Sequence, residues 1–254
     1  MTSDLAARAE RLLSLHVAGD PVVLPTVWDA WSARVAAEQG FLGLTVGSLP
    51  AAAAAGRGDG EDLSLDEMLG LIAVVTKAVD LPVSADLESG YGADPDLLVD
   101  GLLTAGAVGL NLEDTVHSEG GRLRTTAEHA AYIGGVRDAA AARGVHVVVN
   151  GRTDILMHEA GPAEDRLDRV VERLGALAEA GADSLYPVGF HDDSTWQRLV
   201  AELPRPLNAI ARPGEDDLGR FRALGVGRIS FGPLLQRETA ALMGPLLRSW
   251  TPTR

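Results

Sequence analysis

The sequence predicts an α/β fold, a (β/α)8 TIM-type barrel, in a single domain that spans residues 1–254. Short β-type runs alternate with helical segments along the whole chain, and eight such runs occur. Alternation of this kind produces a parallel sheet covered by helices. A chain of 254 residues also matches the length typical of one barrel, about 250 residues.

An open doubly wound sheet is the alternative architecture. Such a sheet usually has fewer strands and often carries a glycine-rich phosphate turn after its first strand. Here the first expected strand leads into residues 25–29, Pro-Thr-Val-Trp-Asp, which contain no such turn. The closed barrel is therefore the preferred prediction.

The expected elements follow one another in strict alternation. Strands are expected at residues 22–25, 43–46, 83–86, 109–112, 147–151, 184–188, 207–211 and 228–231. Helical periodicity occupies residues 66–79, 95–105, 127–143, 163–180, 194–202 and 218–224. Several of these helices open with Asp, Ser or Pro, as helices often do. Three of them end at Gly106, Gly181 or Gly225 just before a strand, where a left-handed cap favours glycine.

Composition excludes several classes of function. The chain has no Cys, which rules out disulfides, thiolate metal ligands and a cysteine nucleophile or acid. Its net charge of -14 would repel nucleic acid and anionic lipid, so neither is an expected partner. The first residues lack the apolar run of a secretory signal, and no stretch approaches the roughly 20 apolar residues of a membrane span. We expect a cytoplasmic protein.

Acidic residues stand at the ends of neighbouring strands, where a barrel places its active site. Asp86 and Glu88 close the third expected strand, and Glu113 follows the fourth. Residues two apart in a strand point the same way, so these carboxylates should converge on the barrel mouth. Carboxylate oxygens suit Mg2+, and Arg152 after the fifth strand could hold a substrate carboxylate with its planar guanidinium.

Each of these acids alone could be an ordinary helix cap or ion-pair partner. Their convergence argues otherwise, because several like charges at one mouth repel unless a cation or shared protons offset them. The sequence therefore favours a metal site built from Asp86, Glu88 and Glu113.

The chain resembles the isocitrate lyase and phosphoenolpyruvate mutase superfamily, including its oxaloacetate decarboxylase-like members. The most specific motif is Ala-Asp-Leu-Glu-Ser-Gly-Tyr-Gly at residues 85–92, followed by the Glu-Asp pair at 113–114 and by Arg152. Residues 25–34 are similar to the family's opening segment. The resemblance covers nearly the whole chain and implies the barrel fold.

The resemblance also implies roles for individual residues. Asp86 would be the principal ligand of Mg2+, with Mn2+ as an alternative ion, and Glu88 and Glu113 would complete the metal shell. The substrate, a small carboxylate, would be held by Gly47, Ser48, Leu49, Asp86 and Arg152, with Trp28 as a wall. Residues 51–62 would form a mobile lid that carries Asp59 to the site, or else only a helix end and a flexible connection.

One loop departs from the family pattern. Members that cleave isocitrate or methylisocitrate carry an acid Cys after the Glu-Asp pair, whereas this chain has His117 and Glu119 as the nearby candidate proton donors. For His117, an exposed position without a role is an open alternative. The Lys and Asn-Ser of phosphoryl-transferring relatives are also missing, although Arg122 or Arg124 could substitute for them.

The predicted function is Mg2+-dependent cleavage of a C–C bond in a small 2-oxo or 2-hydroxy (di)carboxylate, with Arg152, Glu113, Asp59 and His117 as catalytic residues. Two alternatives stay open: mutase-like or hydrolase-like P–C chemistry, and a barrel that binds a dicarboxylate without turnover. The resemblance further implies a homo-oligomer, a dimer or tetramer. The last helix of the chain, expected within residues 238–250, could be swapped between subunits.

Overall fold

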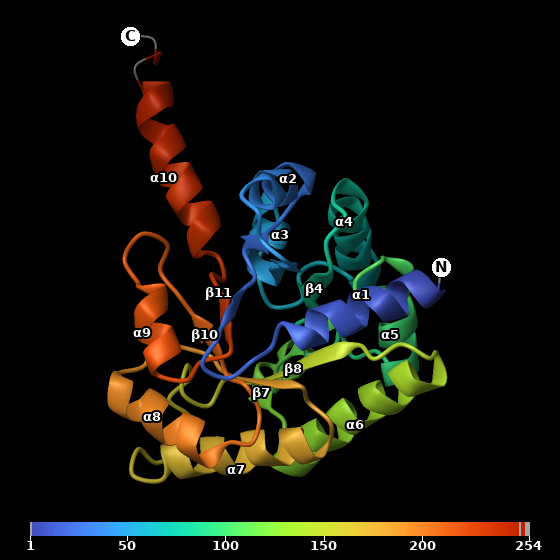
Figure 1. Cartoon of the computed structure of the whole chain (residues 1–254), viewed down its shortest axis with the longest axis vertical. Helices are drawn as coiled ribbons and strands as arrows, with labels where there is room; N and C mark the ends of the chain where they lie inside the picture. The colour runs from blue at the N-terminus through green and yellow to red at the C-terminus, as the bar shows by residue number, and fades with distance from the viewer. Residues whose placement is uncertain (1, 249, 252–254) are drawn as a thin grey trace.

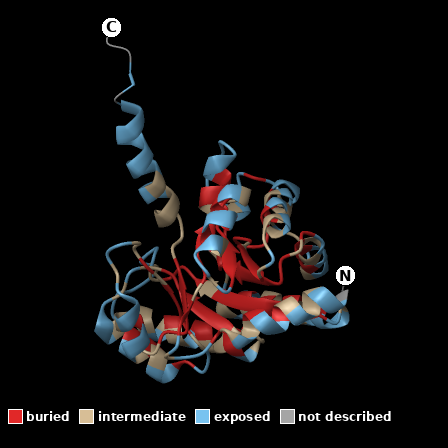
Figure 2. Cartoon of the chain, turned by 45° about the horizontal axis from the view of Figure 1, so that its top comes forward, coloured by how far each residue is buried: buried red, intermediate tan, exposed pale blue. Residues whose placement is uncertain are grey.

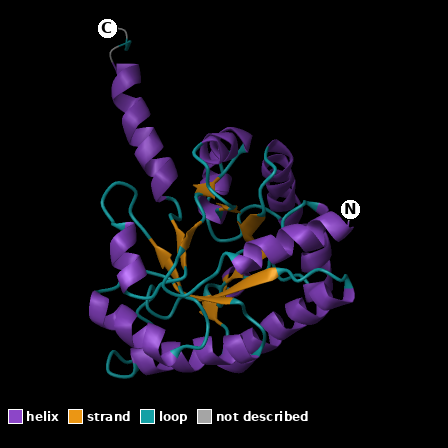
Figure 3. Cartoon of the chain, viewed as in Figure 1, coloured by secondary structure: helices purple, strands orange, loops and turns teal. Residues whose placement is uncertain are grey.

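The computed structural model describes residues 2–248 together with 250 and 251. Its parallel strands lie at the centre and are surrounded by helices (Figures 1 and 3). Six strands pair side by side in the order β2 (Thr26–Val27), β3 (Leu44–Val46), β4 (Val83–Asp86), β5 (Gly109–Leu112), β8 (Val148–Thr153) and β9 (Ser184–Pro187). A second group contains β1 (Val22–Val23), β11 (Arg228–Ser230) and β10 (Asn208–Ile210).

The two groups join into a closed ring. β1 pairs with β11 and β2 pairs with β3, and both belong to the continuous segment 22–27. On the other side, a parallel bridge between Leu185 and Leu207 connects β9 to β10. The predicted eight-stranded barrel is thus confirmed, with segment 22–27 as its first strand.

The first strand is interrupted, which the sequence did not predict. Leu24 donates its N–H to Ile229 of β11, whereas Pro25 has no N–H and instead accepts from Thr45 of β3. The segment therefore pairs with β11 up to Leu24 and with β3 from Pro25 onward. The strand expected at 147–151 is also shifted and lengthened, because β8 continues to Thr153.

Helices follow the strands as expected. They are α1 (Thr2–Ser14), α2 (Ala30–Glu38), α3 (Ser48–Ala54), α4 (Leu65–Ala78), α5 (Pro95–Thr104), α6 (Thr126–Ala142), α7 (Arg166–Glu179), α8 (Asp193–Glu202), α9 (Leu218–Ala223) and α10 (Leu234–Arg248). Reciprocal capping boxes start α4 at Ser64 with Glu67 and α6 at Thr125 with Glu128, and they satisfy N–H groups that a helix start leaves without partners. Most of the alanine run at 51–55 belongs to α3, so the mobile segment expected at 51–62 is shorter than predicted.

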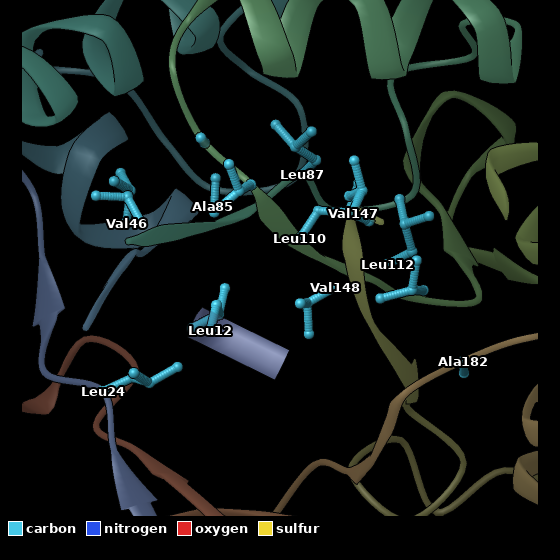
Figure 4. Packing of buried hydrophobic residues seen from close by; sticks show 14 of the residues in the cluster. Leu12, Leu24, Val46, Ala85, Leu87, Leu110, Leu112, Val147, Val148 and Ala182 are labelled. Carbon is cyan, nitrogen blue, oxygen red and sulfur yellow. The ribbon is translucent and has the colours of Figure 1, made fainter. Parts of the chain in front are cut away.

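The core fills the barrel and the layer between strands and helices (Figure 2). Leu12 of α1 is fully buried and lies close to the strands at the amino-terminal end of the barrel (Figure 4). A Cβ added to Gly109 would lie 2.8 Å from Leu12 Cδ2, and one added to Gly43 would lie 3.6 Å from Cδ1. Glycine at position 109 therefore gives Leu12 the room to close the barrel floor, whereas the distance at Gly43 is ordinary van der Waals contact.

Two further features lie outside the barrel wall. Between β5 and α6, a hairpin of β6 (Thr115–Val116) and β7 (Arg122–Leu123) encloses the short 3-10 helix η1 (His117–Glu119). The last helix, α10, projects away from the barrel (Figure 1). None of the described helices is long and apolar enough to cross a membrane.

Candidate active site

A cavity of about 220 Å³ lies at the carboxyl ends of the barrel strands. All eight strands of the ring contribute to its lining, through Thr26, Thr45, Asp86, Asn111, Arg152, Tyr186, Ile210 and Ser230. Gly47, Ser48, Leu49 and Asp59 complete the side formed by α3 and the loop after it. The structure therefore brings together nearly all the residues that the sequence assigned to substrate.

Trp28 is the exception among those residues. Its side chain is 8% exposed and belongs to the hydrophobic core, outside the described residues that line the cavity. The neighbouring Asp29 caps α2 by accepting from Ser32 N at 2.7 Å. The turn after β2 thus starts a helix, and the predicted wall role of Trp28 is not supported by its position.

Gly47 and Ser48 enter the cavity at the start of α3. A Cβ at Gly47 would lie 2.6 Å from Thr26 Cγ2 and 2.7 Å from Pro50 Cγ, so only glycine fits. The Ser48 hydroxyl donates to Asp86 Oδ2 at 3.3 Å. α3 therefore contacts the end of β4 directly.

Glu88 reaches the site by a different route from the one predicted. β4 ends at Asp86, and Glu88 adopts a left-handed backbone conformation with φ of 47°. The two side chains are thus placed by a turn and not by strand alternation. Glu88 is 5% exposed; its Oε2 accepts from Glu61 N at 2.7 Å and its Oε1 from the Tyr91 hydroxyl at 3.1 Å.

Glu113 lies between two basic side chains. His117 Nε2 is 2.8 Å from Glu113 Oε1, and Arg152 Nη1 is 2.5 Å from Oε2. Arg152 also contacts Asp154 Oδ1 at 2.7 Å and approaches Asp86 Oδ2 at 3.8 Å. Arg152 therefore connects the cavity, which it lines with Asp86, to the buried Glu113 behind that wall.

Burial and mutual repulsion shift the proton equilibria of these groups. Burial, followed by the charges of Asp86 and Asp59, raises the pKa of Glu88 to about 7. Burial raises the pKa of Glu113 to about 8, although Arg152 opposes this effect. The hydrogen bond to Glu113 raises the pKa of His117 to about 9. Near neutral pH the cluster therefore holds protons that a bound cation could replace.

A metal ion fits this cluster. Glu88, Glu113 and His117 each offer a donor atom, and these atoms lie within 4.8 Å of one another. Two ligands at about 2.1 Å from one ion are at most about 4.2 Å apart, so small side-chain movements would bring these donor atoms to a single ion. Asp86, predicted as the principal ligand, adjoins the group through Arg152 and through Glu88 N, which donates to Asp86 Oδ1 at 3.4 Å, and its ligand role stays a prediction.

Sequence reasoning missed Glu61, which attaches the loop after α3 to the site. Glu61 has φ of 62°, and its Oε1 accepts from Ser89 Oγ at 2.6 Å and from Tyr91 N at 2.9 Å. Its own N–H donates to Glu88. The predicted lid is therefore docked over the acids, and no local motif marked Glu61 for this role.

Asp114 is a second residue to which the sequence assigned no role, and it supports the strand end that carries Arg152. Asp114 is fully buried and accepts from Thr153 Oγ1 at 2.6 Å and from Asp154 N at 2.9 Å. Arg173 of α7 pairs with the same carboxylate. This network fixes the end of β8, which carries Arg152 and Asp154.

Comparison with known proteins identifies the family of this chain. The family model described as phosphoenolpyruvate phosphomutase matches residues 12–250. The chain belongs to this family. It is 31% identical to an oxaloacetate decarboxylase from Chromohalobacter salexigens over 208 residues, which cover 79% of this chain and 70% of that protein.

Solved structures of the family share the fold. A Burkholderia cenocepacia protein provisionally described as a phosphonomutase matches with a TM-score of 0.89 and 38% identity, covering 95% of this chain and 99% of the other. Oxaloacetate acetylhydrolase in complex with its product oxalate matches with a TM-score of 0.81 and 26% identity, covering 96% and 86%. These similarities confirm that the chain belongs to a superfamily of lyases and mutases.

Proposed function

We propose that this family member is a divalent-cation-dependent lyase or decarboxylase that cleaves a C–C bond in a small 2-oxo or 2-hydroxy (di)carboxylate. The observation that carries the proposal is the buried acidic cluster of Glu88 and Glu113, joined by Arg152 to a cavity that Asp86 lines. Relatives named as an oxaloacetate decarboxylase and an oxaloacetate acetylhydrolase support this class of substrate.

The residues that would hold the ion are Asp86, Glu88 and Glu113, with His117 beside them. Mg2+ is the proposed ion, with Mn2+ as the alternative. When bound, the cation would draw electrons from the 2-oxo acid and stabilise the charge that develops as the C–C bond breaks.

Residues of this chain would orient the substrate and donate the proton that the product needs. Arg152 presents its guanidinium to the cavity while Asp154 holds it in place. His117, in contact with Glu113, would hold the proton that the product carbon finally receives. Asp59 lines the cavity from the lid side and would help exclude water.

Contacts in the hairpin favour C–C over P–C chemistry. Arg122, one candidate for phosphoryl binding, is paired with Glu119 at 2.6 Å and with Glu128 at 2.9 Å. Arg124 stacks on Tyr132, with 4.5 Å between the guanidinium carbon and the ring centroid. Two carboxylates offset the charge of Arg122 and Arg124 is held against Tyr132, so neither takes the place of the lysine that phosphoryl-transferring relatives carry.

A steady-state assay tests the proposal. We expect pyruvate release from oxaloacetate to require Mg2+ or Mn2+, to cease in EDTA, and to be lost in Asp86→Ala, which should also bind the ion poorly. Turnover of phosphonopyruvate instead would support the P–C alternative. Oxalate binding without turnover of any 2-oxo acid would support a binding protein and contradict the proposed reaction.

We also propose that the protein is a cytoplasmic homo-oligomer, with residues 1–254 forming one barrel domain. No described residue of α10 is buried, and Leu242 and Leu247 on it are 73% and 62% exposed. Packing this helix against a second subunit would remove apolar surface from water. Light scattering on the full chain tests the prediction, which a monomer at micromolar concentration would contradict.

A further inference from the structure

The wall of the cavity includes a neutral side chain that the proposed chemistry leaves without a role. Asn111 of β5 is 5% exposed and lines the cavity. It pairs in register with Asp86 on one side and with Asn150 on the other. Its carboxamide therefore lies at the base of the proposed substrate site.

Below Asn111, the barrel interior contains a buried guanidinium. Arg228 of β11 is completely buried, and its Nη2 donates to Asn111 Oδ1 at 3.0 Å and to Ser84 Oγ at 3.4 Å. Its Nε and Nη1 have no hydrogen-bond partner within the described part of the chain. Burying a cation with so few partners is costly, which points to a role besides packing.

These contacts determine which way the Asn111 amide faces. Arginine can only donate hydrogen bonds, so the atom of Asn111 that faces Arg228 must be its oxygen. The same oxygen accepts from Asn150 Nδ2 at 2.9 Å. With Oδ1 held twice from the barrel interior, the Nδ2 amino group is the part of the side chain left to face the cavity.

We propose that Asn111 is a substrate-binding residue whose Nδ2 donates to a carboxylate oxygen of the ligand, and that Arg228 is the positioning residue that holds the amide in this orientation. The inference rests on the proposed function, because it assumes a carboxylate ligand. A neutral donor is suited to this place, since it binds an anionic oxygen without pairing with the neighbouring Asp86.

Asn111→Asp provides a nearly isosteric test. The variant keeps an oxygen toward Arg228 and Asn150 but replaces the donor facing the cavity by a second oxygen. We expect the Kd for oxalate, measured by calorimetry with Mg2+ present, to rise about 10-fold or more. The KM for oxaloacetate should rise similarly with a smaller change in kcat, because the lost contact serves substrate and transition state alike.

Arg228 is tested by a matched pair of variants. Arg228→Met should raise the KM because the amide can then rotate, whereas Arg228→Lys retains a donor and should restore much of the loss. A purely structural role would instead lower the unfolding temperature in both variants with KM unchanged, and that result would overturn the inference. If Asn111→Asp does not fold, Asn111→Ala removes the donor without adding charge.

The outcomes separate the inference from the function on which it rests. Wild-type protein that binds no oxalate would overturn both. Wild-type protein that binds oxalate, with Asn111→Asp and Asn111→Ala binding it equally well, would overturn the inference alone. Oxalate binding without turnover of oxaloacetate would contradict the proposed reaction, and the oxalate Kd of the variants would still decide the role of Asn111.

Discussion

Replacing Glu88 by Gln should remove the pH dependence that this carboxyl imposes on stability. In the folded, metal-free protein, burial raises the pKa of Glu88 from 4.5 to about 7. Between these values the folded state holds a proton that the unfolded state has released, so the free energy of unfolding falls as pH rises. At about 1.4 kcal/mol per pKa unit, the loss approaches about 3 kcal/mol above pH 7.

Glutamine at this position keeps the local hydrogen bonds. Its oxygen can accept from Glu61 N, and its amino group can donate to the hydroxyl oxygen of Tyr91, which rotates to accept. Between pH 5 and pH 8 in EDTA, the free energy of unfolding of Glu88→Gln should therefore fall by about 2–3 kcal/mol less than that of wild type. Added MgCl2 should stabilise wild type at pH 8 and stabilise the variant much less. A ligand that binds only the folded state raises the free energy of unfolding, and the rise is larger when the ligand binds more tightly.

The assay is urea unfolding followed by circular dichroism at both pH values, with and without Mg2+. Glu10→Gln, at an exposed position on α1, is the matched control and should follow wild type. Equal losses in wild type and Glu88→Gln between pH 5 and pH 8, or equal stabilisation of both by Mg2+, would refute the reasoning.

Three further variants probe the supports of the site. Asp114→Ala leaves Arg173 buried without its partner and should cost about 3–5 kcal/mol of stability in urea unfolding; a loss below 1 kcal/mol would contradict the network. Arg152→Lys loses the planar guanidinium, and kcat for oxaloacetate should drop about 100-fold while the unfolding temperature changes little. Activity close to wild type would instead remove Arg152 from the chemistry. Glu61→Ala frees the lid from Tyr91, so amide exchange in residues 55–63 should accelerate about 10-fold, and unchanged exchange would show that the lid is held elsewhere.

The sequence alone determined the repeating architecture and the residues at the strand ends. Alternating β-type and helical patterns are local, and so are the chain positions of Asp86, Glu113 and Arg152, because each lies at or within one residue of the end of a buried strand. In a parallel barrel all these positions meet at one end. The family motif at 85–92 narrowed the site further, and the structure brings these three side chains together as expected.

Only the tertiary structure decided how the charges are balanced and held. Glu61 docks on the turn after β4, Arg173 pairs with Asp114 across 59 residues, and Arg228 reaches Asn111 across 117. Trp28 looked like a wall from its place in the chain, yet it packs into the core. Such contacts join residues far apart in the chain and depend on side-chain direction inside the closed barrel. Periodicity and local motifs report which face a residue occupies, whereas the partner it meets there is set only when the ring closes.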